Sequence, residues 1–155
     1  MRNPAWDHAD PFVIEVVARE SDVDSYRHVN NAVYLTWLER CAWAHSAAVG
    51  LPESTCVALE RGMAVVHVAL DYLAPARAGD TVQVANWIAD CDGRLRATRR
   101  FQIRRPSDGA TLLRGAIDYV CLNLATGRPA RMPGVFAERY CATIPIEAAP
   151  LEQRT

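Results

Sequence analysis

The chain has 155 residues, of which half are hydrophobic and 23% are charged, and its formal net charge is −1. This length allows one compact domain with a hydrophobic core, and the near-neutral charge does not indicate nucleic acid or an anionic membrane as a partner. All 17 basic residues are arginine, which excludes Schiff-base chemistry by lysine. Any phosphate group must therefore be held by arginine or by backbone N–H groups.

The five cysteines are widely separated and include no C-x-x-C pair, so they predict neither a disulfide framework nor a zinc site. The chain opens without the apolar segment of a signal peptide, and no stretch reaches the ~20 apolar residues of a membrane span. We therefore expect a cytoplasmic protein with reduced cysteines, no metal and no membrane partner.

Two elements are expected before the central stretch of the chain. Residues 1–11 contain two prolines and predict an extended arm. Residues 12–19 are rich in β-branched side chains and predict a strand. Residues 21–50 then combine a tight polar cluster with a long, nearly all-apolar run, and the rest of the chain is expected to be organised around them.

The apolar run predicts a helix of about five turns. Asn30 or Asn31 is suited to be its N-cap, and Gly50 is suited to be the left-handed residue beyond its C-terminus. A helix that is apolar around most of its circumference is usually buried. Asp24 and His28 therefore come just before a buried helix N-terminus, whose free N–H groups and partial positive charge favour anions.

Further elements follow the helix. Residues 52–58 predict a loop with room for a short helical turn, and Asp92-Gly93 and residues 106–109 predict tight turns. Four strands and then one short helix are expected over residues 64–73, 81–89, 94–105, 110–124 and 135–141. This order is typical of an α+β fold in which an antiparallel five-stranded sheet packs on one long helix.

Alternation along two of these strands predicts which side is buried. The even positions of the strand 64–73 are apolar and are expected to pack on the helix: Ala64, Val66, Val68, Leu70 and Tyr72. In the strand 94–105, apolar residues alternate with a polar face that includes Gln102, which indicates water or a partner chain on that side. Most arginines of this strand, Arg99 among them, are expected to lie in solvent.

The polar cluster contains a sequence motif whose residues have a defined spacing. It contains the pattern D-x-Y-x-H-V-N-N-x-x-Y-L, formed by Asp24, Tyr26, His28, Val29, Asn30, Asn31, Tyr34 and Leu35, with Glu39 one turn further on. This pattern resembles the opening of the central helix in hotdog-fold acyl-CoA thioesterases of the 4-hydroxybenzoyl-CoA thioesterase type, and is closest to their long-chain acyl-CoA branch. The resemblance covers roughly residues 12–140.

The resemblance implies a single hotdog domain over residues 1–155, with a core from about 12 to 142 and a sheet wrapped around the helix. It also implies an acyl-CoA substrate, no metal or cofactor, and a site between two subunits of a homodimer or homotetramer. Fatty acyl groups are suggested, while aromatic acyl groups stay open. One or two arginines of the strand 94–105, or Arg128 or Arg131, are expected to meet the phosphates of CoA.

By the same resemblance, Asp24 is the catalytic carboxylate, acting as a nucleophile or as a general base on water. Backbone N–H groups near residues 30–32 would stabilise the oxyanion. His28 is either a second catalytic base or, as we favour, a brace for the loop. The other residues expected to bind substrate are Tyr26, Asn30, Asn31, Tyr34, Glu39, His67 and Arg131.

Simpler roles are open for most of these residues. Asp24 can cap the turn before the helix, the two asparagines can act as helix caps, and Tyr26 can simply pack. Glu39 can belong to a thin polar stripe on the helix, and solvent exposure or core filling is the favoured reading for His67. A structural role and a role in catalysis or substrate binding therefore predict different surroundings for the same side chain.

Three other functions compete with thioester hydrolysis. Hotdog hydratases of enoyl thioesters resemble a D-x-N-P-x-H motif, whereas Asp24 and His28 are four apart with no proline between them. A non-catalytic hotdog that binds acyl thioesters is disfavoured by the retained Asp24. A serine hydrolase is disfavoured because G-x-S-x-G is absent, and Cys41 in the apolar run is more typical of inert packing than of a nucleophile.

Overall fold

The computed structural model describes residues 5–144. The chain divides into two compact units. Unit 1 comprises Met1–His45, Ala69–Asn86 and Arg100–Ala116, and unit 2 comprises Ser46–Val68, Trp87–Arg99 and Ile117–Thr155. The four later strands each run from one unit into the other along the chain. That the whole chain forms one domain stays a prediction.

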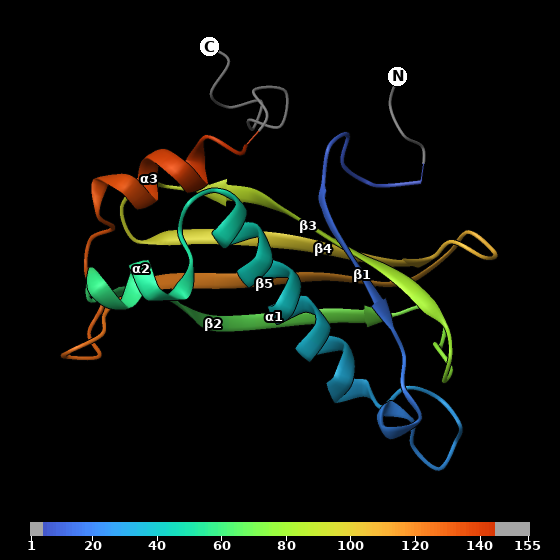
Figure 1. Cartoon of the computed structure of the whole chain (residues 1–155). Helices are drawn as coiled ribbons and strands as arrows, with labels where there is room; N and C mark the ends of the chain where they lie inside the picture. The colour runs from blue at the N-terminus through green and yellow to red at the C-terminus, as the bar shows by residue number, and fades with distance from the viewer. Residues whose placement is uncertain (1–4, 145–155) are drawn as a thin grey trace. The chain divides into compact units, whose positions relative to one another are not determined.

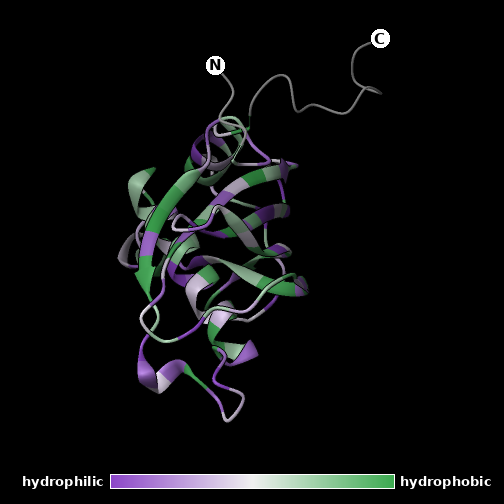
Figure 2. Cartoon of the chain, turned by 90° about the vertical axis from the view of Figure 1, so that its right-hand side faces the viewer, coloured by the Kyte–Doolittle hydropathy of each residue, from purple (hydrophilic) through white to green (hydrophobic). Residues whose placement is uncertain are grey.

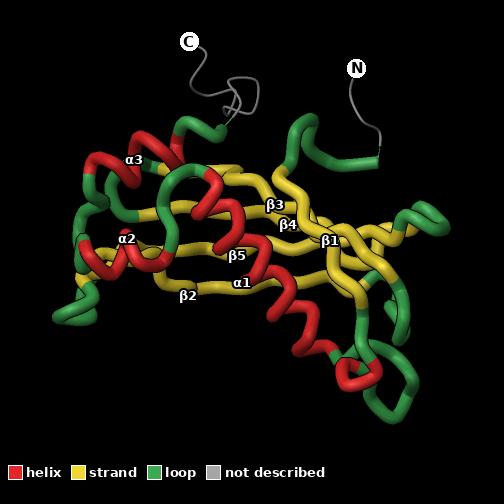
Figure 3. Tube along the Cα trace, in the orientation of Figure 1, coloured by secondary structure: helices red, strands yellow, loops and turns green. Residues whose placement is uncertain are grey.

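The elements follow the expected order (Figures 1 and 3). They are β1 (Phe12–Val17), a 3-10 helix η1 (Glu20–Asp22), α1 (Asn31–Ala48), α2 (Glu53–Ala58), β2 (Arg61–Tyr72), β3 (Thr81–Cys91), β4 (Arg96–Arg105), β5 (Ala110–Asn123) and α3 (Gly134–Cys141). The five strands form one sheet in the order β1-β3-β4-β5-β2. This confirms the α+β class, the five-stranded antiparallel sheet and the long helix that packs against it.

Both ends of α1 are closed as its sequence predicts. Asn30 is the N-cap, because its side-chain Oδ1 accepts the N–H of Ala32 at 2.9 Å. At the other end Gly50 has φ +86°, and its N–H donates to the carbonyl of Ala47. The N–H of Leu51 donates to the carbonyl of Ser46 at 2.8 Å, which completes a Schellman motif.

The expectation that α1 is buried all round is wrong. One side is buried and follows helical spacing: Tyr34, Trp37, Leu38, Cys41, Ala42, His45 and Ser46. The opposite side is exposed within this chain and includes Ala32, Ala47 and Trp43, the last with 44% of its surface accessible. Alanine loses little by facing water, so an alanine-rich run does not specify burial of every face.

In unit 1, α1 is fixed on the pair of strands β1 and β3. These strands are antiparallel, with Phe12 opposite Asn86 and Val17 opposite Thr81. The Phe12 ring stacks on the His45 ring with centroids 5.0 Å apart, and the Cys41 thiol lies 3.2 Å from the Val84 carbonyl. Leu38 of α1 and Val84 of β3 are both fully buried. Figure 2 shows how hydrophobic and hydrophilic residues are interleaved along the strands.

The N-terminal arm covers part of the polar face of β4. Gln102 was expected to face water or a partner chain, but it is only 1% exposed. Its side chain accepts the N–H of Asp7 at 2.9 Å and donates to the Ala5 carbonyl and to the Thr111 hydroxyl. Because the chain's own arm covers this strand, the polar face is buried here without a partner.

Further contacts hold the same arm. The guanidinium of Arg104 lies over the Trp6 ring at 5.4 Å, and Arg114 forms an ion pair with Asp7 at 2.6 Å. A desolvated cation over an indole is favourable, whereas an exposed ion pair contributes little. Stacking and the buried Gln102 bonds therefore hold the arm more than the ion pair does.

Unit 2 has its own hydrophobic core. Helices α2 and α3 and the loops beside them contribute most of it, and the members are Leu51, Cys56, Ile88, Ala97, Cys121, Met132, Phe136 and Tyr140. Arg99, which was expected in solvent, is 6% exposed. Its guanidinium donates to the Ser46 hydroxyl at 3.0 Å and lies over the Tyr140 ring. Arg99 has the same parity as the buried Ala97 and Phe101, so alternation, rather than charge, decides its direction.

One pair of cysteines contradicts the expectation of reduced cysteines. Cys91, at the end of β3, and Cys141, at the end of α3, form a disulfide with their Cα atoms 5.5 Å apart. The two residues are 50 positions apart in the sequence, so spacing gave no sign of the contact. The three free cysteines are buried, and burial raises the pKa of the Cys56 and Cys121 thiols, which makes both poor nucleophiles.

The edge strand β2 is less buried than its alternation predicts. Val66 and Tyr72, expected on the packed face, are 55% and 46% exposed, while Ala64, Val68 and Leu70 are half-buried. Val65 on the opposite side is 44% exposed. The strand lies at the edge of the sheet, so it has a neighbour on one side only.

Among the helices of the described residues, none is long and apolar enough to cross a bilayer.

The turn before β4 gives a test of this part of the fold. The Asp92 carboxylate accepts the N–H groups of Arg94, Leu95 and Arg96 at 2.7, 2.8 and 3.0 Å. Burial alone raises the pKa of Asp92, but these bonds from backbone N–H groups outweigh it and hold the pKa below its usual range. A lowered pKa stabilises the fold above the ordinary Asp value near ~3.9, and this contribution disappears as the pH falls below it.

We expect Asp92→Ala to lower the free energy of unfolding at neutral pH by about 1 kcal/mol, because three turn amides lose their acceptor. Asp92→Asn keeps an acceptor oxygen and should lose less at pH 7. As the pH falls from about 5 to 2, the free energy of unfolding should also decrease less for Asp92→Asn than for the wild type. Urea unfolding at several pH values measures both effects. Equal stability of Asp92→Ala and the wild type would contradict the role of the turn.

Candidate active site

The predicted catalytic cluster forms a small hairpin just before α1. Val23 and Val29 form an antiparallel bridge, and the Asp24 N–H donates to the His28 carbonyl at 2.9 Å. The Arg27 N–H donates to the Asp24 carbonyl at 3.0 Å, and Arg27 itself has φ +66°. This is the three-residue hairpin loop in which a tight turn is followed by a left-handed residue. It places Asp24 and His28 opposite each other at the base of the loop.

The Asp24 side chain has two distinct oxygens. Oδ1 accepts the N–H of Tyr26 at 2.9 Å, so the simpler role as a turn cap is present. Within residues 5–144, no cation forms an ion pair with this carboxylate, and Oδ2 accepts no hydrogen bond. His28 is not paired with it either. The half-buried carboxylate therefore retains one oxygen for chemistry while the other fixes the turn.

Backbone bonds tie this hairpin to the rest of unit 1. The N–H of Val29 donates to the Ala76 carbonyl, and the N–H of Asn30 donates to the Asp22 carbonyl, both at 2.8 Å. Val29 is 2% exposed, so it anchors the hairpin in the core. The position of this hairpin is thus set by the segment that follows β2 as well as by α1.

Two tyrosines complete the anchor. The Tyr34 hydroxyl accepts the N–H of Ala76 at 2.9 Å, and the Tyr72 hydroxyl donates to the Asn31 carbonyl at 2.9 Å. Their rings meet edge to face with centroids 5.5 Å apart. Tyr34 is 2% exposed, and burial raises the pKa of its phenol although the Ala76 N–H acts in the opposite direction. These contacts give Tyr34 a bracing role, and its contact with substrate stays a prediction.

The start of α1 leaves one amide for an oxyanion. The N–H groups of Asn30, Ala32 and Val33 donate to the Asp22 carbonyl, the Asn30 side chain and the Asn30 carbonyl. In the described part of the chain, the N–H of Asn31 donates to no acceptor. Of the amides expected near residues 30–32, only that of Asn31 is therefore available to a ligand.

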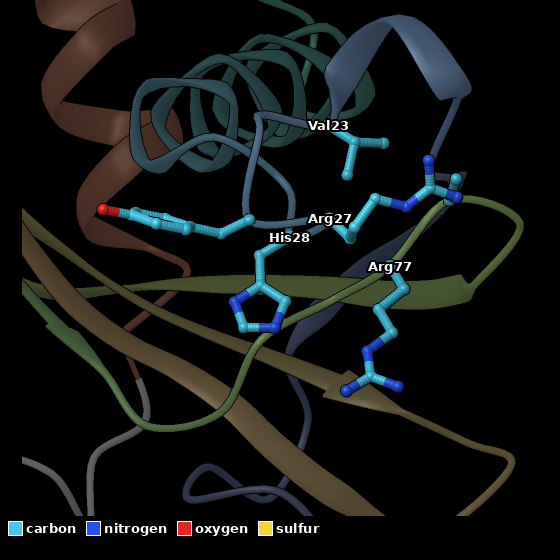
Figure 4. A pocket seen from close by; sticks show the side chains of 6 residues that line it. Val23, Arg27, His28 and Arg77 are labelled. Atoms are coloured by element: carbon cyan, nitrogen blue, oxygen red, sulfur yellow. The ribbon is translucent and has the colours of Figure 1, made fainter.

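A polar depression of about 350 Å³ opens beside the hairpin (Figure 4). Its lining residues come from the loop before α1 and from the loop after β2: Val23, Tyr26, Arg27, His28, Arg77 and Ala78. Tyr26 is 81% exposed and His28 is half-buried. Two guanidinium groups bring positive charge to this depression, and the His28 imidazole lies beside them. Among residues 5–144, no three His, Cys, Asp or Glu side chains are gathered as metal ligands.

The loop after β2 is held in place by an arginine. Arg105, at the end of β4, forms ion pairs with Asp80 at 2.9 Å and with Asp108 at 2.8 Å, and it donates to the Pro75 carbonyl. The hydrogen bond to Asp108 raises the pKa of Arg105 and lowers the pKa of Asp108. Arg105 is thus occupied within the protein, which makes it a poor candidate for binding CoA phosphates.

The remaining predicted site residues are spread more widely. Glu39 is exposed on α1, and no cation among the described residues pairs with it. His67 and Arg131 belong to unit 2, and neither lines the depression. His67 Nδ1 lies 3.6 Å from the Asp118 carboxylate, and Arg131 is exposed. Their roles in substrate binding stay predictions.

The sequence alone did not single out Arg77, which lines the depression together with hairpin residues from a distant part of the chain. Nothing in the loop 73–80 marks this arginine, because its significance depends on a contact between distant segments. Arg27 could have been identified as a candidate site residue from the sequence, because it lies inside the motif between Asp24 and His28.

The fold and the site define a hotdog-type α+β protein with a carboxylate hairpin before its long helix. Residues 18–140 match the model of the thioesterase-like superfamily, and the chain belongs to that family. It is a thioester hydrolase.

One curated protein and several solved structures are similar to this chain. The chain is 26% identical over 129 residues to the long-chain acyl-CoA thioesterase FadM of Escherichia coli, covering 81% of this chain and 93% of that protein. The hypothetical protein TT1821 from Thermus thermophilus has a TM-score of 0.78 at 26% identity, covering 84% and 98% of the two chains. The hypothetical protein SAV2348 from Staphylococcus aureus, solved in complex with CoA, has a TM-score of 0.80 at 18% identity, covering 94% and 93%.

The anchor predicts the effect of removing one hydroxyl. Tyr34→Phe leaves the N–H of Ala76, a fully buried residue, without its acceptor, so we expect a loss of about 1 to 3 kcal/mol in the free energy of unfolding. Tyr72→Phe is the matched control: its hydroxyl is on a more exposed residue, so its loss should be smaller. Chemical denaturation compares the two variants, and a larger loss for Tyr72→Phe would contradict the assigned anchor.

Proposed function

We propose that this thioester hydrolase acts on acyl-CoA, with Asp24 as the catalytic carboxylate. The observation that carries the proposal is that the two oxygens of Asp24 differ. Oδ1 caps the hairpin, whereas Oδ2 accepts no hydrogen bond from the described residues. A carboxylate that is fixed in this way keeps its position while its second oxygen stays accessible to a ligand. Reaction with water converts the thioester into a free acid and the thiol of CoA.

Both routes use the same unpaired oxygen. As a general base, Asp24 takes a proton from a water molecule that attacks the thioester carbonyl. As a nucleophile, Asp24 attacks the carbonyl itself, expels the thiolate and forms an anhydride that water then hydrolyses. Thiolate is a good leaving group, so neither route requires strong help from a general acid.

The Asn31 N–H is proposed to stabilise the oxyanion. It lies at the N-terminus of an 18-residue helix, where the partial positive charge favours an anion. Its position is set by the Asn30 cap on one side and by the bond from Tyr72 to the Asn31 carbonyl on the other. Preorganised donors of this kind need no rearrangement when negative charge develops.

The other polar residues are proposed to bind substrate. His28 borders the depression and is not paired with Asp24, which supports binding or bracing over a role as a second base. Tyr26, Asn30 and Glu39 are exposed around the same segment of unit 1. His67, Tyr34 and Arg131 complete the proposed set.

We propose a fatty acyl group as the substrate's acyl part. Support comes from FadM, which is a long-chain acyl-CoA thioesterase and matches most of this chain. The complex of SAV2348 with CoA supports CoA as the thiol part. Aromatic acyl-CoA substrates are the direct competitors in any assay of specificity.

We further propose that the protein is a homodimer or a homotetramer, with its active site completed by a second copy. The support is the edge strand β2, which exposes Val65, Val66 and Tyr72 and has a neighbouring strand on one side only. The exposed face of α1 adds Trp43 to the uncovered apolar surface. A second copy of the chain that pairs along β2 would cover the strand.

Conservative substitution separates the two roles of Asp24. Asp24→Asn keeps an oxygen that can accept the Tyr26 N–H, so the hairpin should stay intact while kcat for acyl-CoA falls by about 10²- to 10⁴-fold. Asp22→Asn is the matched control, because Asp22 also caps a backbone N–H, that of Arg19, and it should retain near-normal turnover. Thiol release and thermal melting measure both variants. Near-normal turnover of Asp24→Asn would overturn the mechanism.

The proposed assembly predicts a concentration-independent dimer or tetramer at micromolar concentrations in sedimentation velocity. Val66→Asp places a charge on the edge strand and should shift the protein toward monomer, because a charge at an apolar interface is costly to bury. Val57→Asp is the control, since Val57 is similarly exposed but belongs to α2 and not to the edge strand. A monomeric wild type would contradict the proposal.

A further inference from the structure

We propose that Arg27, His28 and Arg77 form a subsite for an anionic oxygen group of the substrate. This inference rests on the proposed function and adds residues that the motif does not assign. The three side chains line one depression, to which Arg27 and His28 come from the catalytic hairpin and Arg77 from the loop after β2 (Figure 4). The two arginines bring positive charge to the surface beside the hairpin that carries Asp24.

The backbone of Arg27 is the first observation. Arg27 has φ +66°, in the left-handed region where a side chain is unfavourable and glycine is preferred. Its hairpin position is the one at which a left-handed residue is required after the turn. A side chain kept at a position that favours glycine suggests that the side chain itself is used.

The charge balance is the second observation. In the described part of the chain, no carboxylate lies within ion-pair distance of the Arg77 guanidinium. Arg27 has only a contact with Glu20 at 3.7 Å, and their side chains are 80% and 74% exposed, so this pair contributes little. Arg105, by contrast, is fully engaged with two aspartates. The two arginines of the depression are therefore available to a ligand.

Nearby carboxylates do not cancel this charge. Asp80 accepts the Arg77 N–H and also pairs with Arg105, so its charge is already balanced. Asp22 accepts the Arg19 N–H, and Asp24 caps the hairpin. Of the six residues that line the depression, none is acidic. Guanidinium groups in such surroundings match phosphate and carboxylate oxygens.

Two parts of a substrate can supply that group. The first is a phosphate of CoA, and the second is a carboxylate at the far end of a dicarboxylic acyl chain. Both present anionic oxygens that arginine binds in the same way. The hairpin links Arg27 and His28 directly to Asp24, so an anion held there fixes the thioester relative to the catalytic oxygen.

The test uses steady-state kinetics of Arg27→Gly and Arg77→Gln with the full-length protein. Arg40→Gln is the matched control, because Arg40 is exposed on α1 and does not line the depression. Substrates are one fatty acyl group carried on CoA and on N-acetylcysteamine, and the corresponding ω-carboxyacyl group on both carriers. Thermal melting monitors the fold, and Arg27→Gly should melt no lower than the wild type since glycine suits a left-handed position.

If the group is a phosphate, each variant should raise KM about 10-fold for both CoA thioesters and leave both N-acetylcysteamine thioesters unchanged. If it is a carboxylate, the increase should follow the ω-carboxyacyl group on either carrier. Increased salt should reduce the difference between variant and wild type in both cases. If Arg27→Gly and Arg77→Gln have the same KM values as Arg40→Gln for every substrate, the proposed subsite is wrong.

Failure of the proposed function gives a different result. If the wild type hydrolyses none of these thioesters, the hydrolytic assignment fails, and calorimetry with CoA and with a free dicarboxylate decides about the subsite. The subsite is supported if Arg27→Gly and Arg77→Gln each bind one of these probes about 10-fold more weakly than the wild type, while Arg40→Gln binds it as tightly as the wild type. No binding to the wild type, or equal binding by all four proteins, contradicts it.

Discussion

The hairpin that carries Asp24 depends on its attachment to the loop after β2. Two bonds through Ala76 make that attachment: its carbonyl accepts the Val29 N–H, and its N–H donates to the buried Tyr34 hydroxyl. Because Tyr34 belongs to α1, the same bonds fix the hairpin relative to the helix start. The unpaired Asp24 oxygen and the Asn31 N–H therefore have defined positions without any direct bond between them.

The chemistry assigned to this site uses few groups. In the proposed mechanism, a carboxylate oxygen supplies the attacking atom or activates water, and one helix amide would face the developing charge. Thiolate leaves readily, so the protein does not need a buried acid or a metal-bound water. The arginines beside the hairpin would then serve binding and orientation, which contribute to the rate by holding the thioester in place.

Much of this arrangement could be predicted from the sequence. The Asn30 cap, the left-handed Gly50 and the order of strands follow from local patterns, and the motif located the hairpin. Burial was harder to predict, because alternation gives the direction of a side chain but not what covers it. Gln102 points away from the core as expected and is nevertheless buried, since the arm from residues 5–11 lies on it. The Cys91–Cys141 disulfide and the role of Arg77 depend on contacts between distant segments, which no local pattern reveals.

The most direct test of the central claim is release of free thiol by the wild-type protein from a panel of CoA thioesters: acetyl, hexanoyl, decanoyl, palmitoyl, benzoyl and phenylacetyl. Under the proposed function we expect hydrolysis of the fatty acyl members, with a preference that rises with chain length and then levels off. No thiol release from any member, together with hydration of an enoyl-CoA by the same protein, would contradict it.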